Sequence, residues 1–222
     1  MFKKILEAVE WSENEIIEEL VKYFMKENAD RDKQELREEI EETLDLSGGR
    51  YSSWGEAGKV EVDGQEYNII CNEDEAERIA REIVKQDLQE QPESFTRDWL
   101  EGFVDTSRFL DDLRADIESW VEESPESYIT EEPEGEDGEY TEEQKRKAVD
   151  EYLENIEDQG VINWLEKELG YSGDQLFNKI SPYLDVNEAA ENAVNTDGWA
   201  HFLSLYDGDY DTTDNGLVIF KE

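Results

Sequence analysis

The chain has 222 residues but only one cysteine, Cys71, and one histidine, His201. A single cysteine excludes a disulfide within the chain and favours a reducing compartment. A single histidine disfavours catalytic triads and histidine-based metal sites, because both need a positioned imidazole with defined neighbours. No apolar run approaches the roughly 18 residues of a membrane span, and Glu7 interrupts the N-terminal residues too early for a signal peptide. We therefore expect a soluble, cytoplasmic protein.

Positive charge is also scarce, since 21 Lys and Arg side chains stand against 62 Asp and Glu, a formal net charge of -41. This charge disfavours direct binding to nucleic acid or to an anionic membrane, because both are negative. It costs stability through self-repulsion and keeps the protein soluble. A basic protein partner, a salt-rich solvent and simple solubility each explain it. The excess of Lys over Arg and the low Ala content argue against salt adaptation.

Aromatic residues are plentiful, with 6 Trp, 10 Tyr and 8 Phe. Leu, Ile, Val and Phe make up 23% of the chain, just above the roughly 20% below which a highly charged chain is expected to be disordered. Disordered chains are poor in aromatic residues. We therefore expect a folded chain with a modest core and an acidic shell.

We predict that the chain folds without metal or cofactor, because its apolar residues follow regular helical and strand spacing. Circular dichroism in EDTA at moderate salt is expected to show a mainly helical spectrum and a cooperative melt. Raising the salt concentration from low to moderate is expected to increase stability, because screening weakens the repulsion between like charges. A coil spectrum that becomes helical only in molar salt would contradict this prediction and favour a halophilic protein.

The first part of the chain indicates two helices and a hairpin. Ser12 and Glu15 form a capping box, and Asp30 or Asp32 is a candidate cap for a second helix. Residues 59–71 alternate apolar and polar residues on both sides of an Asp-Gly turn, which is typical of a two-residue hairpin. A final strand, residues 217–220, is a candidate to pair with it. The pattern predicts an α+β fold, mainly helical, with a small antiparallel sheet formed by the hairpin 59–71 and the C-terminal strand.

The middle of the chain contains its most acidic stretch. Residues 115–144 contain thirteen Asp and Glu and no Lys or Arg. Pro and Gly residues predict an acidic loop at 124–140, and Thr141 with Gln144 forms a capping box that opens the next helix. We expect 1–123 to hold a helical pair, the hairpin and further helices, and 141–222 to form a helical half with the C-terminal strand. One continuous domain is the alternative.

Acidic rows along the predicted helices are the candidate partner-binding residues. Helical positions four residues apart advance about 6 Å, whereas phosphates advance about 3.4 Å per nucleotide along one DNA strand. Two adjacent carboxylate rows can therefore imitate a phosphate track, although a solvated helix face is the simpler explanation for any one row. The candidates are one row, Glu35, Glu38, Glu42 and Asp45; a second partial row, Asp111, Glu118 and Glu122; and the loop residues Glu131, Glu132, Glu134 and Glu136.

Catalytic and metal-binding patterns are weak. Asp207, Asp209, Asp211 and Asp214 are spaced as in a calcium loop, with the first three the candidate ligands, but Thr212 and Val218 occupy the positions where an EF-hand needs Gly and Glu. Carboxylate pairs are too abundant for one to stand out, and there is no Walker loop or Gly-rich dinucleotide turn. Cys71 has no flanking cation that would lower its thiol pKa, and His201 lies between aromatic residues, so both are expected to serve packing.

The C-terminal element Gly198-Trp199-Ala200-His201-Phe202-Leu203-Ser204-Leu205-Tyr206-Asp207-Gly208, with the strand after it, resembles the end of uncharacterised acidic proteins of tailed phages and prophages. The resemblance covers about 25 residues. It implies a viral origin and no particular chemistry, because those proteins have no assigned activity. The usual strand ends in a Tyr-Arg pair, whereas this chain has Phe220-Lys221.

Together these patterns predict a non-enzymatic acidic inhibitor that binds the basic nucleic-acid-binding surface of a partner protein by charge mimicry. A viral protein directed against a restriction or CRISPR component would fit. One alternative is a viral structural or assembly protein, or a salt-adapted protein, whose acidity serves solubility. The other is a metal-dependent enzyme that uses the aspartates after Tyr206. The sequence does not indicate an oligomeric state.

Overall fold

The computed structural model describes residues 11–135, 138–204 and 209–221. It confirms the predicted class, because the chain is mainly helical with one small antiparallel sheet. The chain forms two compact units. Unit 1 comprises Met1–Gln86 with Ala190–Glu222, and unit 2 comprises Asp87–Ala189.

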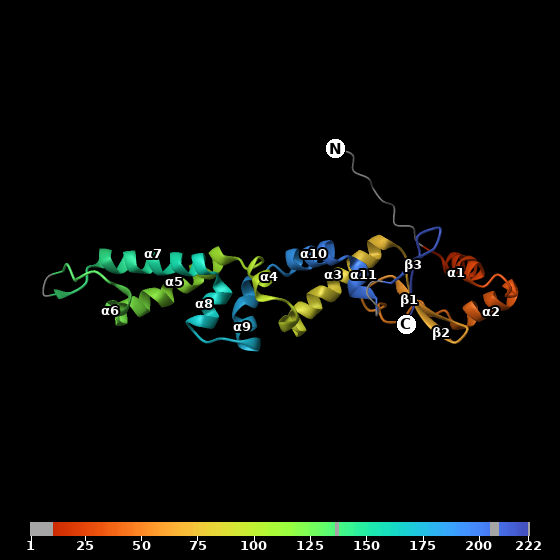
Figure 1. Ribbon diagram of the computed structural model, residues 1–222, viewed down its shortest axis with the longest axis horizontal. Helices are drawn as coiled ribbons and strands as arrows, with labels where there is room; N and C mark the ends of the chain where they lie inside the picture. The colour runs from red at the N-terminus through yellow and green to blue at the C-terminus, as the bar shows by residue number, and fades with distance from the viewer. Residues whose placement is uncertain (1–10, 136–137, 205–208, 222) are drawn as a thin grey trace, which may run out of the picture. The chain divides into compact units, whose positions relative to one another are not determined.

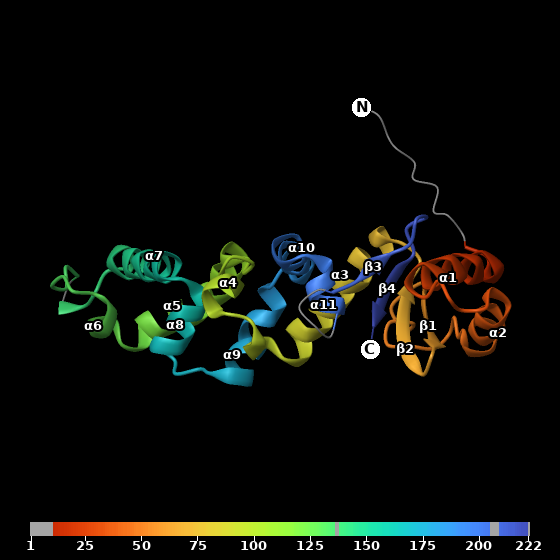
Figure 2. The ribbon, with the colours of Figure 1, turned by 45° about the vertical axis from the view of Figure 1, so that its right-hand side comes forward.

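Unit 1 is built around a four-stranded sheet with the order β1-β2-β4-β3, in which all neighbouring strands are antiparallel (three of the strands are labelled in Figure 1 and all four in Figure 2). Its strands are β1 (Ala57–Val62), β2 (Gln65–Ile70), β3 (Asp211–Thr212) and β4 (Val218–Lys221). Its helices are α1 (Glu13–Glu27), α2 (Lys33–Thr43), most of α3 (Glu73–Glu90), most of α10 (Val186–Asp197) and α11 (Trp199–Leu203).

The core of unit 1 lies between the first two helices and one face of the sheet. Side chains alternate between the faces of a strand, so Val60, Val62, Ile69 and Ile219 share one face. They pack in one cluster with Ile16, Leu20, Phe24, Leu36 and Ile40 of α1 and α2, which lie beside β1 and β2 (Figure 2). On the other face, the Phe220 ring contacts the rings of Tyr51 and Trp199.

Local sequence signals account for much of unit 1. The capping box of Ser12 and Glu15 is present, and Asp32, rather than Asp30, caps α2. Asp63 and Gly64 have φ values of 54° and 73°, the left-handed conformation that a two-residue hairpin turn requires. The predicted pairing of the C-terminal strand with the hairpin is confirmed, since β4 pairs with β2.

The outer edge of β1 is occupied by the chain that follows α2. Asp45 and Lys59 exchange two backbone hydrogen bonds of 2.9 and 3.0 Å. The Thr43 hydroxyl lies 2.8 Å from the Glu61 carbonyl and accepts a hydrogen bond from the Glu61 amide at 3.3 Å. Since an edge strand recruits another chain through unpaired backbone groups, this edge is not a free site for strand addition.

Unit 2 is helical and centres on an antiparallel pair, α5 (Thr106–Glu123) and α7 (Glu142–Gln159). Their apolar faces are buried, including Ile117 and Val121 of α5 and Val149 and Ile156 of α7. The other elements are η1 (Pro92–Ser94), α4 (Arg97–Glu101), α6 (Pro125–Tyr128), α8 (Val161–Lys167), α9 (Gly173–Ile180) and η3 (Ser181–Tyr183).

A carboxylate from α4 caps α8. The N-cap residue of α8 is Gly160, which has no side chain to satisfy the first amides and lies at φ +86°. The Glu101 carboxylate accepts hydrogen bonds from the amides of Val161 and Ile162, at 2.7 and 2.8 Å. A Cβ at position 160 would lie about 3.0 Å from this carboxylate, so glycine serves both the turn and the approach of Glu101.

The two units differ from the division expected from the sequence. The stretch 124–140 was expected to join two halves, but its described residues lie within unit 2, between two helices that pack together. Unit 1 instead combines both ends of the chain, because β4 is added to β2. Long-range strand pairing of this kind groups segments that are distant in sequence.

Candidate partner-binding surface

The structure places three of the four acids of the first row together on a helix. Glu35, Glu38 and Glu42 are exposed on α2. Asp45 does not continue the row, because α2 ends at Thr43 and the backbone becomes extended at Leu44. The Asp45 carboxylate instead accepts hydrogen bonds from the amide and hydroxyl of Ser47, which lower its pKa. Its inclusion in the predicted row was wrong.

The second row lies on α5. Asp111, Glu118 and Glu122 are all exposed. The Glu122 carboxylate lies 2.7 Å from Lys145 Nζ of α7, and Lys145 also pairs with Glu142 at 3.1 Å. The hydrogen bond that Lys145 donates to the Glu122 carboxylate is the main cause of its raised pKa. This lysine therefore neutralises part of the surface that the row was expected to present.

The described part of the acidic loop is held to the first turns of α7 by hydrogen bonds and an ion pair. Glu131 pairs with Lys147 at 2.7 Å. Gln144 is buried, and its amide oxygen accepts hydrogen bonds from the amides of Thr141 (3.0 Å) and Glu134 (3.2 Å). Its amide nitrogen donates to the Glu132 carbonyl at 2.9 Å. The predicted capping box therefore also anchors the loop. Glu136, the fourth candidate of the loop, lies outside the described residues.

Replacing Gln144 tests this anchor. Gln144→Ala is expected to lower stability by about 1–3 kcal/mol, because it leaves two partly buried amides and a carbonyl without their partner. Gln144→Glu keeps the shape but places a carboxylate against the Glu132 carbonyl, so it is expected to destabilise at neutral pH and to recover on acidification. Denaturant unfolding at two pH values measures both effects. Equal stability of Gln144→Glu and wild type at neutral pH would contradict the described amide orientation.

Sequence reasoning missed a further acidic row on α7. Asp150, Glu154 and Glu157 are exposed, and with Asp111 of α5 they line a groove of about 310 Å³. Arg114 also lines the groove and pairs with Asp150 at 2.8 Å. The spacing of these acids, i, i+4 and i+7, was visible in the sequence. What the sequence did not show is that α7 packs beside α5, which brings the two rows together.

Together these side chains form the acidic α5–α7 surface, which consists of the exposed carboxylates of Asp111, Glu118, Glu122, Glu131, Glu132, Glu134, Asp150, Glu154 and Glu157. Cations do not balance it, because Asp87–Ala189 contains 31 Asp and Glu against eight Lys and Arg. Three of those cations, on Arg114, Lys145 and Lys147, already pair with its carboxylates. Exposed ion pairs contribute little stability, so their main effect is local charge compensation.

The candidate metal ligands make other contacts, are exposed, or lie outside the described residues. Asp207 is not among the described residues, and Asp209 is exposed. The Tyr23 hydroxyl donates to the Asp211 carboxylate at 2.7 Å, and Asp214 pairs with Lys26 at 2.8 Å. Within residues 11–135, 138–204 and 209–221, no three or more His, Cys, Asp or Glu side chains are grouped to hold a metal ion.

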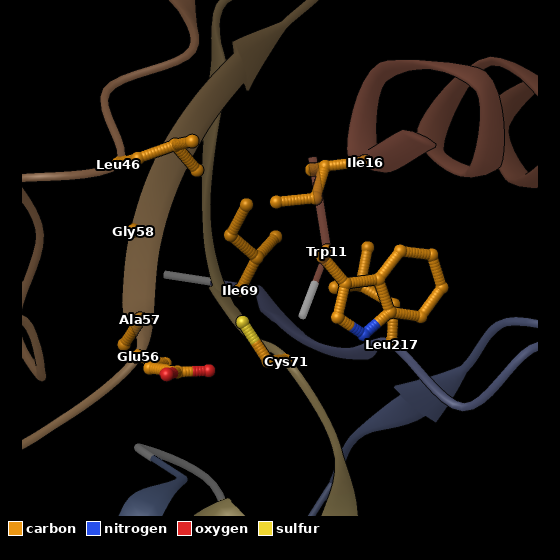
Figure 3. Close-up of a pocket in the computed structure, with 9 residues that line it drawn as sticks. All are labelled: Trp11, Ile16, Leu46, Glu56, Ala57, Gly58, Ile69, Cys71 and Leu217. Atoms are coloured by element: carbon orange, nitrogen blue, oxygen red, sulfur yellow. The ribbon is translucent and has the colours of Figure 1, made fainter. Parts of the chain in front are cut away.

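Cys71 lines a mainly apolar cavity of about 380 Å³ in unit 1 (Figure 3). Trp11, Ile16 and Leu217 contribute apolar walls, and the Glu56 side chain lies near the sulfur. Burial, followed by the negative charges of Glu56 and Glu75, raises the pKa of the Cys71 thiol to about 11. Because the thiolate is the nucleophile, this cysteine is poorly suited to catalysis at neutral pH.

Alkylation of Cys71 is therefore expected to be slow. Raising the thiol pKa from 9.0 to about 11 lowers the thiolate fraction at neutral pH about 100-fold. The more basic thiolate is about tenfold more nucleophilic, which leaves a net slowing of about tenfold before steric protection. Iodoacetamide labelling of the folded and the urea-unfolded protein, followed by mass spectrometry, measures the ratio. Equal rates in the two states would contradict the half-buried thiol and its raised pKa.

Comparison with protein-family models, with curated proteins and with solved structures finds no match for this chain. Among the described helices, none is both long and apolar enough to cross a membrane.

Proposed function

We propose that this protein is a non-enzymatic acidic inhibitor that binds the basic nucleic-acid-binding surface of a partner protein by charge mimicry. One observation carries the proposal. The acidic α5–α7 surface collects nine exposed carboxylates from two packed helices and an anchored loop, and the cations of unit 2 offset only part of their charge.

Carboxylates fixed on packed helices support charge mimicry better than carboxylates on a disordered segment would. Asp150 and Glu154 are one helical turn apart, an advance of about 6 Å, and Asp111, the first acid of the α5 row, lines the same groove. Two rows on packed helices present charge at fixed spacings, as two phosphate strands do. Charge complementarity of this kind raises association rates and selects partners.

The expected partner is a basic protein or complex that itself binds DNA or RNA. A restriction or CRISPR component fits this description, and the protein would then be a viral anti-defence factor that acts in the cytoplasm of the host. We do not propose direct binding to nucleic acid or membrane, because the net charge of -41 opposes both.

Affinity capture from a lysate at low salt tests the class of partner. Two columns would carry wild type and a variant in which Glu131, Glu132, Glu134, Asp150 and Glu154 are Gln or Asn. The wild-type column is expected to retain nucleic-acid-binding proteins that elute as salt rises, and the neutralised column is expected to retain fewer of them. Retention of the same proteins by both columns would contradict the proposal and favour an assembly role.

A further inference from the structure

A second feature of unit 2 lies on the other side of α5. A pocket of about 200 Å³, called the aromatic pocket below, is surrounded by five aromatic side chains together with leucines and three charged residues. Trp164 is fully buried, and Trp120, Tyr171 and Tyr183 are half-buried, so their rings are partly accessible. The aromatic residues are Phe109, Trp120, Trp164, Tyr171 and Tyr183.

Two carboxylates of α5 lie at the aromatic pocket, one helical turn apart. Asp112 accepts a hydrogen bond from the Tyr183 hydroxyl at 3.0 Å. Asp116 is exposed, and its carboxylate has no hydrogen bond or ion pair with any described residue. The third charged residue is Lys179, whose Nζ lies 5.6 Å from the centre of the Tyr171 ring. The two carboxylates and one lysine give the lining a net charge of -1 beside partly accessible aromatic rings.

The pocket wall also contains an unusual polar atom. The indole Nε1 of Trp164 is buried and has no hydrogen-bond partner among the residues described. A buried donor without a partner is uncommon in native proteins. A guanidinium carries only donors and does not pair with this N–H, so the arginine site proposed below depends on the carboxylates and the other rings.

We propose that the aromatic pocket binds an arginine side chain of a partner protein. A guanidinium is planar, stacks on aromatic faces and pairs with carboxylates through two parallel hydrogen bonds. Asp116 supplies the free carboxylate, and Trp120 and Tyr171 supply partly exposed rings. A volume of about 200 Å³ is below the roughly 300–1,000 Å³ typical of small-molecule sites, which favours a single side chain.

Arginine suits this site better than lysine does. The lysine ammonium is compact and strongly hydrated, and it makes no stacking contact through a planar group. The inference rests on the proposed function for the origin of the arginine, since a nucleic-acid-binding surface is rich in this residue. The pocket itself is tested separately, with a peptide.

The experiment titrates the full chain with N-acetyl-Gly-Arg-Gly-amide at an ionic strength of about 0.15 M, where the Debye length is about 8 Å. Tryptophan fluorescence and the NMR signals of the indole N–H groups report binding. The citrulline peptide, which is neutral and nearly the same shape, is expected to bind at least tenfold more weakly. The lysine peptide is expected to bind severalfold more weakly.

Three variants separate the pocket from general attraction to an acidic protein. Asp116→Asn is expected to weaken binding of the arginine peptide about tenfold, whereas Asp158→Asn, an equal charge change at an exposed site on α7, is expected to change it less than twofold. Lys179→Gln removes the competing cation and is expected to tighten binding two- to threefold, a gain that unfolding cannot produce.

Several outcomes would overturn the inference: equal binding of the arginine and citrulline peptides, equal binding of the arginine and lysine peptides, or equal losses in Asp116→Asn and Asp158→Asn. Failure here would leave the acidic α5–α7 surface and the mimicry proposal intact. Conversely, specific arginine binding together with a partner that still holds its nucleic acid would support the pocket and contradict mimicry.

Discussion

Neutralising the acidic loop is expected to slow association with the captured partner by about tenfold at low salt. Electrostatic steering raises association rates by roughly 10 to 10³-fold, and the change Glu131, Glu132 and Glu134→Gln removes three exposed charges from the acidic α5–α7 surface. Dissociation is expected to change less, because exposed charges act mainly on the encounter. Stopped-flow or biosensor kinetics over a range of salt concentrations measure both rates.

A matched variant gives the comparison. Glu35, Glu38 and Glu42→Gln removes the same number of exposed carboxylates from α2 of unit 1. It is expected to slow association less than the loop variant does, and both differences are expected to disappear near 1 M salt, where the Debye length is about 3 Å. Circular dichroism controls for folding. Wild-type association rates in both variants would show that the charge serves solubility.

Ile156→Ala is expected to lower the free energy of unfolding by about 2–5 kcal/mol, the range for truncating a buried aliphatic side chain to alanine. Ile156 is completely buried on the face of α7 that packs in unit 2. The smaller side chain leaves a cavity that the surrounding helices fill only in part. Denaturant unfolding measures the loss, and hydrogen exchange is expected to show increased opening of α7.

The adjacent residue supplies the control for this second prediction. Asn155 is exposed on the same helix, so Asn155→Ala is expected to stay within about 0.5 kcal/mol of wild type. A loss in Ile156→Ala no larger than that in Asn155→Ala would contradict the packing of α7 described above.

Features that depend on contacts within a few residues were predicted correctly from the sequence. The capping boxes at Ser12 and Thr141 depend on a side chain and an amide three residues apart, and the hairpin turn depends on Asp63 and Gly64 adopting positive φ. These local contacts do not depend on how distant parts of the chain pack. The same locality explains why the α+β class was predicted.

Features that depend on long-range packing were not predicted from the sequence. Asp45 continues the helical spacing of the α2 row, but its backbone pairs with Lys59 of β1, and this pairing ends the helix pattern. The short strand β3 has only two residues and exists through its pairing with β4. Likewise, the groove between Asp111 and the α7 acids and the aromatic pocket arise from helices that meet only in the fold.

Competition with nucleic acid is the sharpest test of charge mimicry by the acidic α5–α7 surface. A labelled DNA or RNA ligand is first bound to the captured partner, and unlabelled protein is then added at increasing concentration while fluorescence anisotropy is followed. The account predicts that wild type displaces the nucleic acid completely and that the loop variant needs about tenfold more protein at low salt. Tight binding of wild type to the partner with the nucleic acid still in place would contradict charge mimicry.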